Sequence, residues 1–224
     1  MREPLSAVLF DLDGTLADTL ADIAGAVNEV LAARGLPVHP VRDYLGFVGE
    51  GARRLVERAL PADRQGWVSD VLGEYHDAYA ARLTRETRLY PGIAGMLDGI
   101  VAAGIPIAIL SNKQDAFTRA VAEALLSAWP FRVVYGERVG VPRKPDPAAA
   151  LEIARTLEIP PGRCAFVGDT PVDMKTAVAS GMVGIGVPWG FRPREELIAA
   201  GARVVVASPE ELRERICRGT PEFQ

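Results

Sequence analysis

Cysteine is scarce in this chain of 224 residues, which contains only two, Cys164 and Cys217. Neither belongs to a CxxC pair, and two thiols cannot form a disulfide framework. Cys164 lies in an apolar run, so we expect it to be a small buried hydrophobic residue. This cysteine usage favours a reducing compartment, and a cytoplasmic location is therefore expected.

The beginning of the chain lacks a long hydrophobic run. Residues 1–10 contain one Arg and a four-residue apolar stretch, Ala7 to Phe10, which continues directly into Asp11. Such a stretch is too short to be the core of a signal peptide or to span a membrane. We therefore expect neither a secretion signal nor a membrane partner.

An excess of positive charge is also absent, and lysine is rare. The chain has 25 basic and 29 acidic residues, with a formal net charge of −4. Nucleic-acid-binding domains usually carry a basic patch and a high pI, so no nucleic-acid partner is expected. Only three basic residues are Lys, namely Lys113, Lys144 and Lys175. Because Arg fills the other basic positions, a Lys can mark a place that needs a compact ammonium, with chance surface placement as the competing interpretation.

Short apolar runs alternate with helical patterns along most of the chain. The runs predict buried strands at 6–10, 107–110, 132–135, 164–167, 183–187 and 204–206. Helical spacing predicts helices at about 93–103, 114–127, 147–157, 171–180 and 194–200, and another after Ser208. This alternation predicts an α/β fold, a doubly wound parallel sheet with a Rossmann-like core.

Residues 17–88 interrupt that alternation with helical pattern alone. A first helix at about 18–34 ends at Gly35 and Pro37, the usual punctuation at a helix C-terminus. We predict a small inserted helical cap domain at 17–88 and a catalytic core formed by 1–16 and 89–224. The insertion leaves the core at the carboxyl edge of the sheet, where open α/β sheets bind ligands.

Two acidic residues follow the first expected strand. Asp11 and Asp13 are two apart and point the same way along an extended chain, and Gly14 permits a tight turn. Their carboxylates repel each other, so a cation is expected beside them. A carboxylate nucleophile can divide phosphoryl transfer into two easier steps. The alternative is an N-cap pair for the following helix.

Two further segments offer groups that bind anions. Ser111 and Asn112 follow a strand, so a hydroxyl and the N–H groups of the next helix can form an anion site, or Ser111 is simply a cap. Lys144 lies in a loop stiffened by Pro145 and Pro147. Its ammonium can neutralise phosphate and carboxylates together, unless it is an exposed loop residue.

A second acidic pair follows a later strand. Asp169 and Asp173 are four apart and flank the start of a helix. Carboxylates at this edge of the sheet suit Mg²⁺, which prefers hard oxygen ligands. The alternative is that Asp169 only caps the helix. The four segments share one edge of the predicted sheet, and this shared location favours a single site.

These motifs resemble those of the haloacid dehalogenase-like hydrolase superfamily over nearly the whole chain. DxDGT matches Asp11 to Thr15, the strand followed by Ser matches Ser111, the Lys before a Pro-rich helix start matches Lys144, and GDxxxD matches Gly168 to Asp173. Three further segments are similar to the phosphoglycolate phosphatase subgroup. They are the turn Gly49-Glu50-Gly51, Tyr90-Pro91-Gly92 and Val187-Pro188-Trp189-Gly190.

The resemblance implies a phosphatase mechanism for the first two motifs. Asp11 is expected to attack phosphorus and become an aspartyl-phosphate. Asp13 is expected to protonate the leaving oxygen and later to activate water, with Thr15 helping to position it. Ser111 and the Asn112 amide are expected to hold phosphate oxygens, with Thr15 counted among the phosphate-binding residues.

The resemblance also implies a magnesium site and a catalytic lysine. Lys144 is expected to tether the phosphate and the nucleophile. Mg²⁺ is expected to be bound by Asp11, the backbone carbonyl of Asp13, and Asp169, with Asp173 supporting the site. These roles agree with phosphoryl transfer, in which positioning and charge neutralisation provide most of the catalysis.

The sequence predicts a small phosphorylated metabolite as substrate and leaves its identity open. Arg53 and Arg54 follow the cap turn and could bind a substrate carboxylate such as that of 2-phosphoglycolate, or could be solvated helix charges. A pyrophosphatase, a sugar-phosphate phosphatase, a phosphomutase and a non-catalytic phosphate-binding regulator are the alternatives. His39 and His76 are expected to be ordinary cap residues, and the oligomeric state stays open.

Overall fold

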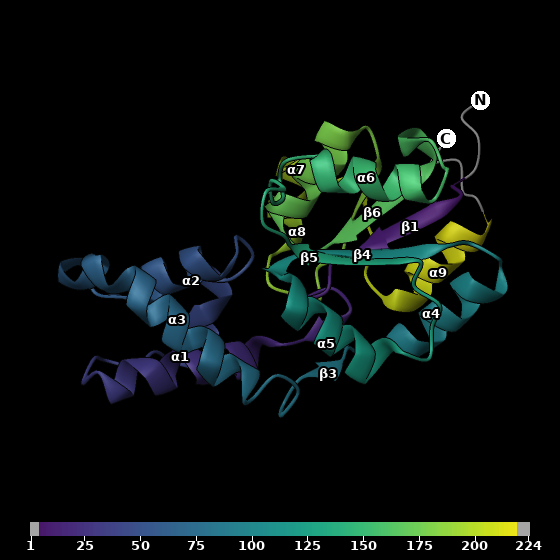
Figure 1. The fold of residues 1–224 in the computed structure, drawn as a ribbon. Coiled ribbons are helices and arrows are strands. Elements are labelled where there is room, and N and C mark those ends of the chain that lie inside the picture. Colours follow the sequence, from purple (N-terminus) through teal and green to yellow (C-terminus); the bar gives the residue numbers. More distant parts are fainter. Residues whose placement is uncertain (1–4, 219–224) are drawn as a thin grey trace.

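The computed structural model describes residues 5–218, so residues 1–4 of the predicted core and residues 219–224 lie outside it. A six-stranded sheet in which all neighbouring strands are parallel forms the centre of the core (Figure 1). In spatial order its strands are β5 (Val133–Glu137), β4 (Ile107–Gln114), β1 (Ala7–Phe10), β6 (Cys164–Gly168), β7 (Val183–Gly186) and β8 (Val204–Val205).

Helices cover both faces of this sheet. One face packs against α4 (Ile93–Ala102), α5 (Asp115–Leu126) and α9 (Pro209–Arg218), and the other against α6 (Ala148–Thr156), α7 (Pro171–Ser180) and α8 (Arg194–Ala199) (Figure 1). In β1, the side chains of Val8 and Phe10 belong to the hydrophobic cluster that includes α4, α5 and α9. Those of Ala7 and Leu9 belong to the cluster on the other face, which includes α6. A strand buried on both faces is apolar throughout, which explains the runs in the sequence. The predicted fold class is confirmed.

The inserted segment forms a helical lobe beside the core (Figure 1). Its elements are α1 (Leu20–Ala33), the 3₁₀ turns η1 (Val41–Gly46) and η2 (Ala62–Trp67), α2 (Ala52–Ala59) and α3 (Val68–Ala80). These elements share one hydrophobic cluster that contains the fully buried rings of Tyr44 and Tyr79. We call this lobe the cap.

Two short strands connect the cap to the core. β2 (Ala17–Asp18) and β3 (Arg88–Leu89) pair antiparallel where the chain enters and leaves the cap. Beside them, one carboxylate oxygen of the buried Asp22 accepts hydrogen bonds from the backbone N–H groups of Glu86 and Thr87 and from the Thr87 hydroxyl, at 2.8–2.9 Å. The two connections are therefore bonded to each other as well as to their own domains.

The loop after β7 also touches both domains. Phe191 belongs to the segment of the chain that forms the core domain, but its ring is buried in the hydrophobic cluster of the cap. The guanidinium of Arg192 donates hydrogen bonds to the backbone oxygens of Leu45 and Val48 in the cap. The cap is thus docked on the core by an aromatic side chain and by a charged one.

Strand β4 continues further than the sequence predicted. It includes Ser111, Asn112 and Lys113 and ends at Gln114, so α5 begins only at Asp115. The continuation pairs with β5, where a Cβ on Gly136 would lie 2.5 Å from the Lys113 backbone oxygen. Only glycine permits this close approach. The predicted end of the strand at residue 110 and the alternative that Ser111 caps a helix are therefore wrong, whereas the helix begins close to the predicted position of about 114.

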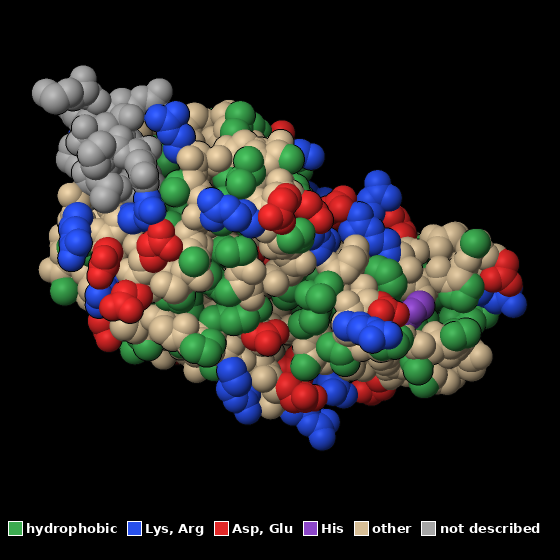
Figure 2. Space-filling model, turned by 180° about the vertical axis from the view of Figure 1, so that it is seen from behind, with side chains coloured by type: hydrophobic (Ala, Val, Ile, Leu, Met, Phe, Trp, Pro, Cys, Tyr) green, Lys and Arg blue, Asp and Glu red, His purple; other side chains and the backbone are tan. Residues whose placement is uncertain are grey.

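Acidic and basic side chains are interspersed over the face that Figure 2 shows, on the core and on the cap. Within residues 5–218, no helix has the length and hydrophobicity needed to cross a membrane.

Candidate active site

The predicted motifs meet at the carboxyl edge of the sheet. Strands β4, β1 and β6 are neighbours in its centre. Asp11 and Asp169 directly follow β1 and β6, and Ser111 lies in the C-terminal half of β4. Because all three strands run in the same direction, the residues that follow them share one edge. Asp11, Ser111 and Asp169 are almost completely buried there.

A buried lysine lies between two carboxylates at this edge. The Lys144 ammonium is 3.0 Å from Asp11 Oδ1 and 2.7 Å from Asp173 Oδ1. Only 1% of the Lys144 side chain is exposed, so the interpretation as a loose surface residue is excluded. The cation that repulsion between neighbouring acids required is therefore present, and it comes from the predicted residue.

Burial and neighbouring charges shift the pKa values in opposite ways. Burial, assisted by Asp173 and Asp13, raises the pKa of Asp11 to about 7, against the attraction of Lys144. Burial and the Asp173 and Asp11 charges raise the pKa of Asp169 well above its ordinary range. For Lys144, burial lowers the pKa, but the two adjacent carboxylates outweigh it and the net shift is upward. Lys144 is therefore charged, while Asp11 and Asp169 resist full ionisation.

The carboxylate of Asp169 is held by two elements distant in sequence. The Thr15 hydroxyl donates to Asp169 Oδ1 at 2.8 Å, and the Phe191 N–H donates to Oδ2 at 2.8 Å. The Trp189 indole donates to the Thr15 backbone oxygen at 3.0 Å. A Cβ on Gly190 would lie 2.4 Å from Asp169 Oδ2, so the loop fits against the acid only with glycine there. Thr15 thus bonds Asp169, and not Asp13 as the resemblance implied.

Asp173 has both carboxylate oxygens engaged. Oδ1 accepts from Lys144, and Oδ2 accepts from the N–H and the hydroxyl of Thr170 in a capping box at the start of α7. The N-cap residue of this helix is therefore Thr170, so the interpretation of Asp169 as a simple N-cap is excluded. Asp173 therefore helps to hold Lys144 next to Asp11.

The acidic cluster fits a divalent cation. Asp11, Asp169 and Asp173 each have a carboxylate oxygen within 4.8 Å of the others, and all three are buried. When ionised, three carboxylates beside one ammonium leave two negative charges in a region shielded from water. Hard oxygen donors with a net negative charge are typical of Mg²⁺ sites. Residues 5–218 therefore hold a suitable set of ligands.

Magnesium is expected to stabilise the protein more at high pH than at low pH. The folded protein binds more protons than the unfolded chain at Asp11 between about pH 4 and pH 7, and the raised pKa of Asp169 acts in the same direction. These two groups therefore make the free energy of unfolding fall as pH rises through that window when metal is absent. Mg²⁺ binds the ionised acids and opposes the fall.

Thermal unfolding with and without Mg²⁺, at about pH 5.5 and about pH 8, checks this expectation. The increase in Tm caused by Mg²⁺ is expected to be several degrees larger at the higher pH. Asp169→Asn, which removes one of the titrating ligands, is the comparison and is expected to reduce the difference. Equal stabilisation at both pH values would contradict the assignment.

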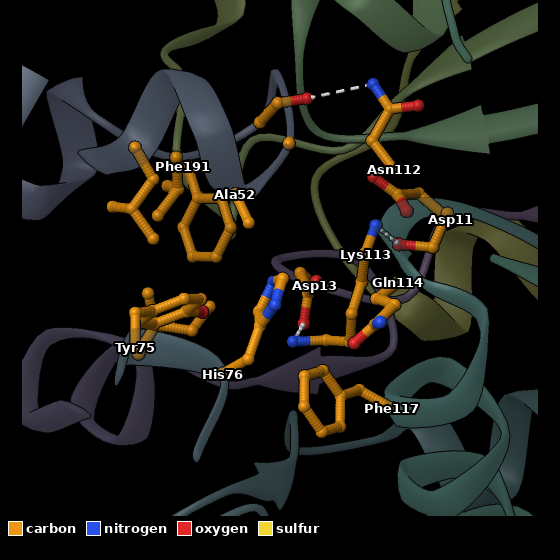
Figure 3. Close-up of a pocket in the computed structure, with 16 residues that line it drawn as sticks. Asp11, Asp13, Ala52, Tyr75, His76, Asn112, Lys113, Gln114, Phe117 and Phe191 are labelled. Carbon is orange, nitrogen blue, oxygen red and sulfur yellow. Dashed lines mark hydrogen bonds and ion pairs between the residues drawn. The ribbon is translucent and has the colours of Figure 1, made fainter. Parts of the chain in front are cut away.

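Asp13 faces a cavity and is paired with a lysine that the sequence analysis left without a role. The Lys113 ammonium is 3.0 Å from Asp13 Oδ1, as an ion pair and not an aligned hydrogen bond (Figure 3). The ammonium also donates to the hydroxyl of Tyr79 in the cap at 2.7 Å. The scarcity of lysine is the one signal in the sequence for Lys113, and it applies equally to Lys144 and Lys175.

The cavity lies between the cap and the carboxyl edge of the sheet. It encloses about 570 Å³, including the part open to solvent. Figure 3 shows Asp11 and Lys113 toward one side of the cavity and Ala52, Tyr75 and Phe191 toward the other. The apolar part of its lining consists of Ile23, Val48, Ala52, Leu55, Tyr75, Phe117 and Phe191.

The predicted phosphate-binding pair also borders the cavity. Ser111 and Asn112 both line it. The Asn112 side-chain amide donates to the backbone oxygens of Lys144 at 3.0 Å and Gly49 at 3.3 Å (Figure 3). It therefore links the lysine loop to the turn of the cap. Ser111 Oγ accepts a hydrogen bond from the Lys113 N–H at 3.2 Å, which leaves its own proton available to a ligand.

The structure does not bring Arg53 and Arg54 to the cavity. Both are exposed, and Arg54 pairs with Glu57 on the same helix at 2.7 Å. The next residues, Leu55 and Val56, occupy the buried face of α2, so its helical period directs the arginines outwards. The interpretation of the two arginines as solvated helix charges fits this geometry.

One residue expected to be ordinary does border the cavity. His76 lines it, with its ring 5.8 Å from that of Phe117. Partial burial lowers the pKa of His76 below its usual value of 6.5, so the ring is neutral at pH 7. The helical pattern of α3 could place His76 next to the buried stripe, but it could not show that this edge faces the core.

Named proteins similar to this chain include several phosphoglycolate phosphatases. That of Nitrosospira multiformis is 33% identical over 210 residues, covering 92% of each chain. That of Escherichia coli strain K12 is 31% identical over 231 residues, covering 94% of this chain and 92% of its own. The predicted similarity to this subgroup is confirmed.

Solved structures agree with these relatives, and a family model covers most of the chain. A provisional phosphoglycolate phosphatase from Lactobacillus delbrueckii subsp. bulgaricus superposes with a TM-score of 0.88 at 30% identity, covering 96% of this chain and 99% of that one. A hydrolase from Deinococcus radiodurans R1, solved with bound phosphate and sodium, has a TM-score of 0.75 at 28% identity, covering 96% of both chains. The model for haloacid dehalogenase-like hydrolases matches residues 5–181, and this chain belongs to that family.

Proposed function

We propose that this hydrolase is a magnesium-dependent phosphatase that acts on a small phosphomonoester, with 2-phosphoglycolate as the leading substrate, through an aspartyl-phosphate on Asp11. The observation that carries the proposal is the arrangement around Asp11. Its carboxylate borders the cavity, is paired with a buried ammonium and adjoins two further buried acids. A reducing cytoplasm is the expected location.

The chain's own residues can perform both steps of the reaction. A carboxylate oxygen of Asp11 forms a bond to phosphorus while the bond from phosphorus to the substrate oxygen breaks. Asp13 gives its proton to that leaving oxygen, so the product departs as an alcohol. Asp13 then takes a proton from a water molecule that attacks the aspartyl-phosphate, which releases inorganic phosphate and restores Asp11.

Charge neutralisation accompanies both steps. Lys144 and the Ser111 hydroxyl are placed to hold the phosphoryl oxygens beside Asp11. The carboxylates of Asp11 and Asp169 and the backbone carbonyl of Asp13 would hold Mg²⁺, with Asp173 fixing Lys144 behind them. When bound, Mg²⁺ supplies further positive charge against the phosphoryl oxygens.

The cavity favours a substrate whose leaving group is small and carries one negative charge. Lys113 is the one Lys or Arg among the described residues that line it, whereas pyrophosphate brings more negative charge than one cation balances. The cap contributes mainly apolar side chains, which offer little to the hydroxyl groups of a sugar. Helix α2 begins at the cavity with Gly51 as N-cap, so its first N–H groups can receive a carboxylate.

Phosphate release from a panel of substrates tests this proposal. With purified full-length protein and Mg²⁺, kcat/KM for 2-phosphoglycolate is expected to exceed that for glucose 6-phosphate and for pyrophosphate by at least about 10-fold. The reason is that a carboxylate finds partners in the cavity and sugar hydroxyls do not. Faster turnover of the sugar phosphate, or a bisphosphate product, would indicate one of the alternatives.

Arg53→Ala and Arg54→Ala provide the control for the carboxylate assignment. Neither side chain lines the cavity, so both variants are expected to keep the preference for 2-phosphoglycolate. Loss of that preference in either variant would assign carboxylate binding to the arginine and not to the start of α2.

A further inference from the structure

Lys113 is a buried cation that joins the core to the cap. It belongs to β4 of the core, and only 6% of its side chain is exposed. Its backbone oxygen accepts a hydrogen bond from the Thr118 hydroxyl at 3.0 Å and lies against Gly136 of the neighbouring strand. The backbone from which the ammonium extends is therefore fixed on two sides.

On the core side, Lys113 is the partner of Asp13. The ammonium is 3.0 Å from Asp13 Oδ1, and the Asp13 side chain, which is 17% exposed, borders the cavity. Within residues 5–218, the Asp13 carboxylate has no hydrogen bond from another side chain and no second ion pair. Lys113 is therefore the one side chain among these residues that is paired with the Asp13 carboxylate (Figure 3).

On the cap side, the same ammonium is bound by Tyr79 of α3. It donates to the Tyr79 hydroxyl at 2.7 Å and lies 4.4 Å from the centre of the ring, within range of a cation–π interaction. Tyr79 is fully buried, stacks on Tyr75 at 5.7 Å and meets Phe117 of α5 edge-on at 5.2 Å. The ring is therefore held where the cap meets the core.

We propose that Lys113 is a positioning residue that holds Asp13 toward the leaving oxygen and does so fully only while Tyr79 of the docked cap holds Lys113. This inference rests on the proposed function, because it requires Asp13 to be the proton donor. A cap displaced from the core removes Tyr79 from the ammonium. Asp13 then loses its orientation, so proton delivery is tied to the position of the cap.

Leaving groups of different acidity provide the test. An alkyl phosphate such as ethyl phosphate needs a proton on the leaving oxygen, whereas p-nitrophenyl phosphate releases a stable anion without one. Release of each leaving group is measured in a single turnover at saturating substrate with Mg²⁺. Lys113→Met is expected to slow ethanol release about 100-fold and nitrophenolate release less than about 5-fold.

Two further variants make the result specific. Tyr79→Phe keeps the ring and removes the hydroxyl, and it is expected to slow ethanol release about 10-fold without a matching loss on the aryl substrate. Lys175→Met removes an exposed lysine of α7 and is expected to match the unaltered protein. Tyr79→Phe also tests the inference independently if Lys113→Met does not fold.

The outcomes separate the inference from the proposed function. Asp13→Asn is the benchmark, and it must itself slow alkyl release far more than aryl release. If it does not, Asp13 is not the proton donor and both proposals fail. If Asp13→Asn behaves as expected but Lys113→Met slows both substrates equally, or only weakens binding of 2-phosphoglycolate, the inference alone is overturned.

Discussion

Asp11→Asn is expected to lower the rate of phosphomonoester hydrolysis by about 10⁴-fold or more. The amide has nearly the same shape as the carboxylate, but its oxygen is a poor nucleophile toward phosphorus. Lys144 keeps its place, because it is still bonded to Asp173 at 2.7 Å. The loss therefore reports on chemistry and not on a collapsed site.

Stability measurements distinguish this loss from misfolding. Burial raises the pKa of Asp11 to about 7, which means that the ionised carboxylate is unfavourable where it lies. A neutral amide avoids that penalty, so the Tm of the metal-free variant at about pH 8 is expected to equal or exceed that of the unaltered protein. Retained phosphatase activity in Asp11→Asn with Mg²⁺ present would refute the mechanism.

Lys144→Met is expected to remove both activity and stability. The variant leaves the buried carboxylates of Asp11, Asp169 and Asp173 without their cation, and breaking a buried ion pair from one side costs about 3–5 kcal/mol. Turnover is expected to fall by about 10³-fold, because one of the groups that neutralise the phosphoryl oxygens is gone.

Magnesium should restore part of the stability of this variant and little of its activity. Two positive charges can replace one ammonium among the acids, but they cannot take its place beside the phosphoryl group. Denaturant unfolding with and without Mg²⁺ measures the first effect, and steady-state kinetics measures the second. Lys175→Met, on an exposed face of α7, is the matched control. A Lys144→Met variant as stable as this control would mean that Lys144 does not compensate the acids.

Much of the core could be predicted because its signals are local. Each buried strand is an apolar run, and in a parallel sheet the residue that follows a strand must lie at the carboxyl edge. Asp11, Ser111 and Asp169 could therefore be assigned to one place without knowing how the strands are ordered. The order itself, with β1 between β4 and β6, is a long-range property that no local pattern contains.

The cap side of the site was harder to predict, because it depends on how two packed units face each other. Tyr79 and His76 lie in one helical pattern, but nothing in that pattern says which edge of α3 meets the core. The sequence does not show whether Lys113 belongs to a strand or lies in an exposed loop. The reason is that the continuation of β4 depends on Gly136, in a strand more than twenty residues away. The helical period of α2 explains why Arg53 points outwards. The helical period of α3, in contrast, did not reveal that Tyr79 would contact Lys113.

The contacts that hold Asp169 at the predicted metal site were not predicted, because the residues that make them are far away along the chain. Asp169 is held by Thr15 and by the N–H of Phe191, from opposite ends of the sequence. The segment from Val187 to Gly190 was noted only as a subgroup resemblance. In the folded protein Gly190 packs against the Asp169 carboxylate, where a side chain would not fit. This contact could not be predicted, because the fold is needed to bring the two segments together.

The hydrogen bonds of Asp22 limit how the cap can move. Asp22 lies just after the chain enters the cap, and its carboxylate binds the segment that leaves the cap, so these hydrogen bonds hold the two connections together. A lobe attached in this way can swing about a single pivot but can hardly twist. If the cap moves, we expect it to swing about this pivot and to bring the ring of Tyr79 back to the same ammonium.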